Sequence, residues 1–210
     1  MSDYKFISQP KEIEKKSFEI ISHLLEGKNI NPLHEPIIIR AIHTTADPDY
    51  ADILKFSENA VLKGIQALKS GCGIVTDTRM AEAGINKKGL AKLGAYISCF
   101  MDDKQVAKEA VERGITRAAV SMEKASLDSH NKLFVIGNAP TALIKLYELI
   151  SEGLAKPELV IGVPVGFVNV VESKELFKKC NAPYIISDGR KGGSNVAAAI
   201  VNALVIMAGE

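Results

Sequence analysis

KLFVIGN (residues 132–138) and ELVIGV (158–163) decide the fold of this chain, because each is a short, continuous apolar run that contains a glycine near its end and precedes a segment of helical pattern. Three more runs share this character: GIVTD (73–77), AYISCF (95–100) and PYIIS (183–187). Apolar strands that alternate with helices are typical of a parallel sheet covered by helices. The sequence therefore predicts an α/β fold, a single domain over residues 1–210 with a mostly parallel central sheet and helices on both faces.

The residues upstream of the first strand are predicted to be helical. EIEKKSFEIISHLLEG (12–27) and AVLKGIQALKS (60–70) place apolar residues at helical spacing, and Ser57 is the expected N-terminal cap of the second helix. The isoleucines of EPIIIRAIHTTAD (35–47) favour a strand by propensity. We predict a helix there, because Pro36 suits a first helical turn and the apolar positions follow one stripe.

The loops after the predicted strands are small, polar and rich in glycine: TDT (76–78), GNAPT (137–141), GVPVGF (162–167) and SDGRKGGSN (187–195). Open parallel sheets bind ligands at this edge, and the helix starts behind the loops are expected to supply free N–H groups. SDGRKGGSN can hold a carboxylate or a phosphate, although it matches neither a Walker loop nor GxGxxG. The alternative is that this loop is only the start of a helix.

The composition argues against several classes of protein. Lysine and arginine number 26 against 25 acidic residues, so the charge does not point to nucleic acid or to an anionic membrane surface. No apolar segment reaches the roughly 20 residues that span a bilayer, and MSDYKFISQPKEIEKK at the N-terminus lacks the features of a signal peptide. Cys72, Cys99 and Cys180 are far apart in the chain. We therefore expect a cytoplasmic protein with reduced thiols.

His43 is the candidate for acid–base chemistry. It lies in RAIHTTADPDY (40–50), three residues after Arg40, so both side chains are expected on one helical face, with Thr44 and Thr45 available to orient the ring. Imidazole exchanges a proton near neutral pH, but a histidine held by hydrogen bonds in the core is the alternative. The other histidines, His23, His34 and His130, are expected in solvent or packing roles. The spacing of His and Cys predicts no metal site.

Six stretches together resemble one known family: RAIHTTADPDYADILKFSENAV (40–61), GIVTDTRM (73–80), TRAAVSM (116–122), VIGNAPTAL (135–143), VIGVPVGFVNVVESKE (160–175) and SDGRKGGSNVAAAIVNAL (187–204). In order and spacing the chain is similar to the precorrin-8X methylmutases of cobalamin biosynthesis, including their cobalt-precorrin counterparts. The resemblance extends from Ser17 to the last predicted helix. It implies an isomerase that moves a methyl group from carbon 11 to carbon 12 in ring C of a corrinoid precursor, a 1,5-sigmatropic shift that uses no cofactor.

The resemblance also implies roles for particular residues. The family's proton-donating histidine falls on His43, and its substrate-contacting serine and arginine fall on Ser17 and Arg40. Thr44 is expected to contact the substrate beside them. Peripheral carboxylates of the macrocycle are expected at three further places: Arg117, Asn138 and the backbone of Gly192 and Gly193. One departure is Ala46, which stands where the family pattern leads us to expect glycine.

The resemblance further implies a homodimer whose substrate pockets lie near the subunit interface. The apolar C-terminal helix AAAIVNALVIM (197–207) is expected to need cover from a second copy. Two other functions stay open at this point: a corrinoid-binding carrier without turnover, and an unrelated nucleotide-binding enzyme, which the missing phosphate motifs disfavour. The sequence does not decide whether the substrate carries cobalt.

Overall fold

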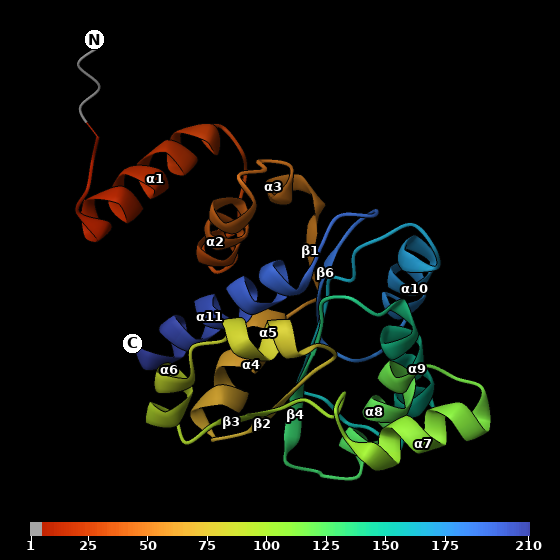
Figure 1. The fold of residues 1–210 in the computed structure, drawn as a ribbon. Coiled ribbons are helices and arrows are strands. Elements are labelled where there is room, and N and C mark those ends of the chain that lie inside the picture. The colour runs from red at the N-terminus through yellow and green to blue at the C-terminus, as the bar shows by residue number, and fades with distance from the viewer. Residues whose placement is uncertain (1–5) are drawn as a thin grey trace.

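The centre of the computed structural model, which describes residues 6–210, is one six-stranded sheet (Figure 1). The strands lie in the order β1-β6-β5-β4-β2-β3. Their bounds are β1 Leu54–Phe56, β2 Gly73–Thr76, β3 Tyr96–Ser98, β4 Asn131–Ile136, β5 Leu159–Gly162 and β6 Tyr184–Ser187. All neighbouring strands are parallel except β1, which pairs antiparallel with β6 at one edge. The predicted α/β fold with a mostly parallel sheet is confirmed.

Strand β4 shows why the apolar runs are continuous. Leu133 and Val135 pack into the core on one face of the sheet, while Phe134 and Ile136 pack into the core on the other face. Because successive side chains in a strand point to opposite faces, a strand covered on both faces needs apolar residues at every position. The strands β2, β4, β5 and β6 are buried in the same way, whereas β3 lies at the edge of the sheet and is more exposed.

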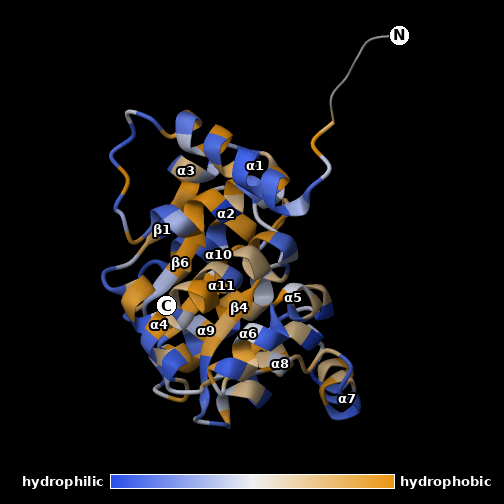
Figure 2. Cartoon of the chain, turned by 90° about the vertical axis from the view of Figure 1, so that its left-hand side faces the viewer, coloured by the Kyte–Doolittle hydropathy of each residue, from blue (hydrophilic) through white to orange (hydrophobic). Residues whose placement is uncertain are grey.

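Helices cover both faces of the sheet (Figure 1). One core cluster joins the sheet to α2 (Glu35–Thr45), α4 (Ala60–Lys69) and α11 (Ser194–Gly209), and the other joins it to α8 (Arg117–Ser126), α9 (Pro140–Ser151) and α10 (Val170–Phe177). The remaining helices are shorter or more peripheral: α1 (Pro10–Leu24), α3 (Tyr50–Ile53), α5 (Arg79–Gly84), α6 (Lys87–Lys92) and α7 (Lys104–Arg113). Figure 2 shows hydrophobic residues concentrated on the strands and α11, whereas α1 is largely hydrophilic.

The helix predictions upstream of the sheet are confirmed in kind, with two differences in detail. The helix predicted within residues 35–47 is confirmed as α2, and Ile37, Ile38 and Ile42 form part of its buried stripe. Ser57 does not cap α4, which begins after Asn59; the Ser57 hydroxyl instead accepts a hydrogen bond from the Tyr184 N–H at 2.8 Å. Strand β1 was not predicted, because three residues between two helices carry no periodicity.

The C-terminal helix α11 is already covered within the protomer. It packs against α2, α4, α5 and α6, and most of its apolar residues are buried. The expectation that this helix needs a second copy to cover it is therefore wrong. Within residues 6–210, no helix combines the length and apolar character that a membrane span requires.

Candidate active site

Four of the predicted site residues come together where α1 lies against α2. Ser17 is on α1, and Arg40, His43 and Thr44 are on α2. Arg40, His43 and Thr44 line one cavity of about 280 Å³. The prediction that Arg40 and His43 share one face of a helix is confirmed, because both side chains open into this cavity.

Ser17 contacts His43 directly. The Ser17 hydroxyl lies 2.8 Å from Nδ1 of His43. When the hydroxyl donates this hydrogen bond, the neutral ring carries its proton on Nε2, the nitrogen that remains for a ligand. The ring of Phe18 packs edge-on against the imidazole, with ring centroids 5.2 Å apart and planes at 81°. A hydroxyl and an aromatic edge together hold the ring of His43 in one orientation.

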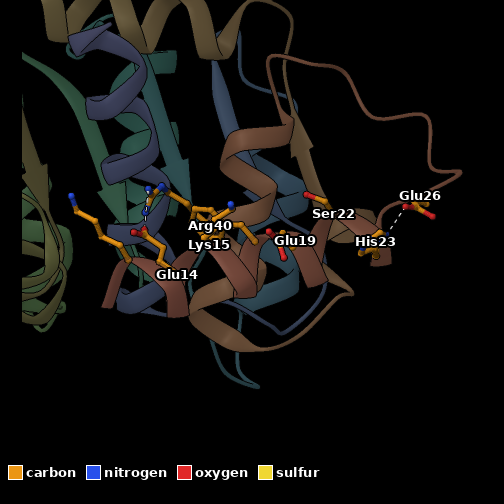
Figure 3. A pocket seen from close by; sticks show the side chains of 9 residues that line it. Glu14, Lys15, Glu19, Ser22, His23, Glu26 and Arg40 are labelled. Carbon is orange, nitrogen blue, oxygen red and sulfur yellow. Dashed lines mark hydrogen bonds and ion pairs between the residues drawn. The ribbon is translucent and has the colours of Figure 1, made fainter. Parts of the chain in front are cut away.

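Arg40 lies between the His43 cavity and a second, more open cavity of about 620 Å³ along α1. Figure 3 shows Arg40 reaching from α2 toward Glu14 on α1, whereas His23 and Glu26 lie together at the far end of that helix. Arg40 Nη2 is 3.6 Å from the Glu14 carboxylate, and the guanidinium lies 5.4 Å from the centre of the Phe18 ring. Among residues 6–210 Arg40 has this one long ion pair, which leaves several of its N–H donors for a ligand carboxylate.

The alternative of a histidine buried in the core is excluded, and the expected role of the neighbouring threonines is wrong. The His43 side chain is exposed in the protomer, because the buried stripe of α2 runs through neighbouring positions and His43 projects outward. The adjacent threonines do not orient the ring: the Thr45 hydroxyl donates to the Ala41 carbonyl at 2.7 Å and accepts from the Asp47 N–H. The residue that holds His43 is Ser17, which the sequence had singled out only as a substrate contact.

The opposite wall of the His43 cavity is formed by α11 and the end of α5. Asn195, Ala198, Ala199 and Asn202 line it together with Gly84. The Asn202 amide is already engaged, since its Oδ1 accepts from the Asn86 N–H at 2.8 Å and its Nδ2 donates to the Gly84 carbonyl at 2.9 Å. Asn195 is exposed in the first turn of α11. The sequence indicated Asn195 only as the last residue of the SDGRKGGSN loop, and its position after a predicted strand was the signal for a site residue.

Arg117 and Asn138 lie in a different cavity, of about 560 Å³, near the start of α5. Gly84 at the end of α5 borders the His43 cavity, whereas Arg79 at its start borders this one. Both Arg117 and Asn138 are exposed. The structure therefore places the predicted residues in two cavities that flank one short helix.

The N–H groups of the GNAPT loop are not free, contrary to the expectation for this strand end. The buried carboxylate of Asp77 accepts hydrogen bonds from the backbone N–H groups of Gly137, Asn138 and Ala139 at 2.8, 2.8 and 2.6 Å. Burial raises the pKa of Asp77, and these N–H donors act in the opposite direction. An internal carboxylate thus occupies the backbone donors of residues 137–139, and the side chains of Asn138 and Thr141 are among those that line the cavity.

The backbone of SDGRKGGSN is also engaged. The Gly193 N–H donates to the Val163 carbonyl at 2.9 Å, so it is not free for a substrate carboxylate as expected. A Cβ at Gly192 would lie 2.1 Å from the same carbonyl oxygen, which explains the glycine by close approach of two backbones. Ala46, the departure from the expected glycine, ends α2 in the left-handed region with φ 54°. A glycine would adopt that conformation without strain.

Comparison with known proteins identifies the family. The family model described as precorrin-8X methylmutase matches residues 12–207. A cobalt-precorrin-8 methylmutase of Salmonella typhimurium is 48% identical over 208 residues, covering 95% of this chain and 96% of the relative. One from Priestia megaterium is 44% identical over 200 residues, covering 95% and 89%. The crystal structure of a precorrin-8x methyl mutase from Thermus thermophilus matches with a TM-score of 0.87 and 36% identity, covering 94% of this chain and 96% of that one. This chain belongs to the precorrin-8X methylmutase family.

Proposed function

We propose that this protein is an isomerase of cobalamin biosynthesis that converts precorrin-8X, or its cobalt complex, by moving a methyl group from carbon 11 to carbon 12 of the macrocycle. The bond from the methyl group to carbon 11 breaks as the bond to carbon 12 forms, so the reaction needs no oxidant, reductant or methyl donor. Membership of the family supports this activity. Both relatives described above bear the cobalt-precorrin-8 name, so we expect the cobalt form to be converted.

The observation that carries the proposal is the contact between Ser17 and Nδ1 of His43 at 2.8 Å, beside Arg40. A ring held in this way presents Nε2–H to the cavity. A hydrogen bond from Nε2–H to the ring C nitrogen would polarise the conjugated system in which the methyl group migrates, and would stabilise the transition state more than the substrate. The guanidinium of Arg40 would bind a peripheral carboxylate and set the macrocycle against His43.

Arg117 and Asn138 are proposed to bind carboxylates farther along the rim of the same substrate. Their cavity borders the start of α5 and the His43 cavity borders its end, and neither is large enough to enclose a whole tetrapyrrole. A broad macrocycle with carboxylates on its rim fits dispersed polar contacts better than one deep pocket. Thr44, which lines the His43 cavity, is proposed as a further contact.

We also propose a homodimer, with α1 in or near the interface. Ile13, Ile20 and Leu24 on α1 are 47%, 52% and 51% exposed, and their spacing of seven and four residues places them on one face of the helix. A second copy over α1 would also cover the exposed His43 and give it the drier surroundings that strengthen a hydrogen bond. We further propose a cytoplasmic location, which the three free cysteines Cys72, Cys99 and Cys180 support.

The test is single-turnover conversion of precorrin-8X and of cobalt-precorrin-8, followed by absorption spectroscopy. The parent protein should convert at least one form. His43→Ala should keep the fold and product affinity but lose on the order of 10²-fold in rate, the usual contribution of a positioned acid. His130→Ala, which removes an exposed histidine in the turn before β4, serves as the control. A parent that only shifts the spectrum in proportion to its own concentration would instead be a carrier.

A further inference from the structure

Lys174 on α10 is a fully buried lysine outside the site described so far. Its side chain is 0% exposed, and its ammonium donates to the Ser187 hydroxyl at 3.1 Å and to the carbonyls of Gly189 and Lys191, both at 2.9 Å. Three N–H donors therefore meet three acceptors. Burying a cation is costly unless its donors are satisfied, and here the acceptors belong to a single loop rather than to a carboxylate. The loop between β6 and α11 is wrapped around this ammonium.

The same loop carries a second lysine to the turn that follows α2. The exposed Lys191 Nζ lies 2.6 Å from the Asp47 carboxylate and 2.7 Å from the Asp49 carboxylate. Asp47 is four residues beyond His43, just after the helix that carries it. The backbone carbonyl of Lys191 is held by Lys174 and by the Ser187 hydroxyl at 2.8 Å, while its side chain holds the α2 turn. One residue thus links the buried ammonium to the element that bears His43.

The loop also leads directly into the opposite wall of the His43 cavity. Gly193 follows it as the residue before α11, and Asn195 in the first turn of that helix lines the cavity. The Gly193 N–H is fixed to the Val163 carbonyl. The loop therefore reaches both walls, α2 through the Lys191 side chain and α11 through the continuous backbone.

We propose that Lys174 is a positioning residue for the reaction: its ammonium shapes the loop 187–191, and the loop sets the α2 turn, and with it His43, against Asn195 on α11. An apolar side chain of similar length would pack there at a lower desolvation cost but would leave three acceptors unpaired and the loop without a fixed shape. Burial lowers the pKa of Lys174 to about 8, with Asp188 raising it and Lys178 lowering it, so the ammonium keeps its charge at neutral pH.

The test compares Lys174→Met, Lys191→Met and the double variant, with Lys179→Met as the control. Lys174→Met keeps the length of the side chain and removes its donors. Lys191→Met removes only the ion pairs of the exposed Lys191 ammonium with Asp47 and Asp49. Lys179 is exposed just beyond α10 and has no role in this network. Two quantities are measured on folded protein: the single-turnover rate, and the ¹⁵N resonances of the His43 ring without substrate.

Each single variant should lose on the order of 10-fold in rate, the effect of a small displacement of a catalytic group, with product affinity nearly unchanged. The double variant should lose no more than the worse single variant, because both act through one loop. The His43 resonances should move in both single variants and stay in place in Lys179→Met. A purely structural lysine would lower the melting temperature and leave these resonances where they are.

The proposal is overturned if folded Lys174→Met keeps both the parent rate and the parent His43 resonances, or if the two losses multiply in the double variant. If Lys174→Met does not fold, Lys191→Met still tests the proposal, because the Lys191 side chain is exposed and the loss of its ion pairs should not prevent folding. Unchanged His43 resonances in that variant would sink the idea. The predicted rates rest on the proposed function, but the predicted changes in the His43 resonances do not. A parent protein without turnover would therefore refute the proposed function and leave the resonance test valid.

Discussion

His43 depends on a partner that is 26 residues away along the chain. The residue types around His43 pointed to acid–base chemistry, and its place on a helical face beside Arg40 followed from spacing alone. The partner could not be found in that way, because the nearby threonines offered the same hydroxyl as Ser17. Which hydroxyl reaches the ring depends on how α1 docks on α2, and that docking leaves no local trace in the sequence.

Ser17→Ala should lower the turnover rate without removing the acid. The variant keeps His43 and the fold but leaves Nδ1 without its fixed partner, so the ring can change tautomer and orientation. We expect a loss of about 10-fold, the value of one hydrogen bond to a polar partner and smaller than the loss in His43→Ala. Single-turnover rates and product titrations measure the split between catalysis and binding.

The conservative variant Ser17→Thr provides the matched comparison for that loss. It keeps a hydroxyl at the same position of α1 and should recover much of the rate. A parent-like rate in Ser17→Ala would mean that the 2.8 Å contact does not orient the ring during turnover. A large loss of product affinity with an unchanged rate would return Ser17 to the role of a substrate contact.

At the scale of elements, the strands were predictable because their burial on both faces leaves an unbroken apolar pattern. The loops between them were predictable only in composition. Their small and polar residues pointed to ligands, yet Asp77 uses the N–H groups of 137–139 and Val163 uses that of Gly193. Lys174 carried no signal at all, because a lysine at one position of a helix reads as solvent-exposed until the fold buries it.

The buried ammonium of Lys174 gives stability a particular pH dependence. Its folded-state pKa of about 8 lies below the ordinary lysine value, so the folded protein releases this proton before the unfolded chain does. Between these two values the unfolded chain binds more protons, and the free energy of unfolding therefore gains a contribution that rises with pH. Below pH 8 both states are protonated, and the full cost of burying the charge is present.

Urea unfolding of the parent and of Lys174→Met between pH 7 and 10 isolates this contribution. Other groups titrate in the same window, but they are shared by both proteins and cancel in the difference. The parent should gain stability relative to the variant as the pH rises above about 8. A difference that stays constant with pH, or that falls, would show that the folded protein holds this proton as tightly as the unfolded chain.

In a single protomer the proposed site is exposed to solvent next to α1. This helix packs against α2 through Ile21 and Phe18, and His43 beside it is exposed. The dimer was predicted from the family resemblance and from the apolar C-terminal helix, and the structure removes the second reason, since α11 is covered within its own protomer. The sequence does not predict the exposed apolar face of α1, because apolar residues at helical spacing are equally consistent with a helix that buries all of them.

Ile20→Glu should separate the two subunits if α1 lies in the interface, because it places a charge in the middle of the exposed apolar face. Val111→Glu is the matched control, since Val111 is 83% exposed on α7, away from α1. Light scattering at micromolar concentration should give the parent and the control about twice the protomer mass of 22.6 kDa, and Ile20→Glu the protomer mass. Turnover should also fall in monomeric Ile20→Glu, because water competes for the hydrogen bond of an uncovered His43.

A parent of protomer mass with full turnover would show that one copy completes the site. A dimeric Ile20→Glu would place the interface on another face of the protein.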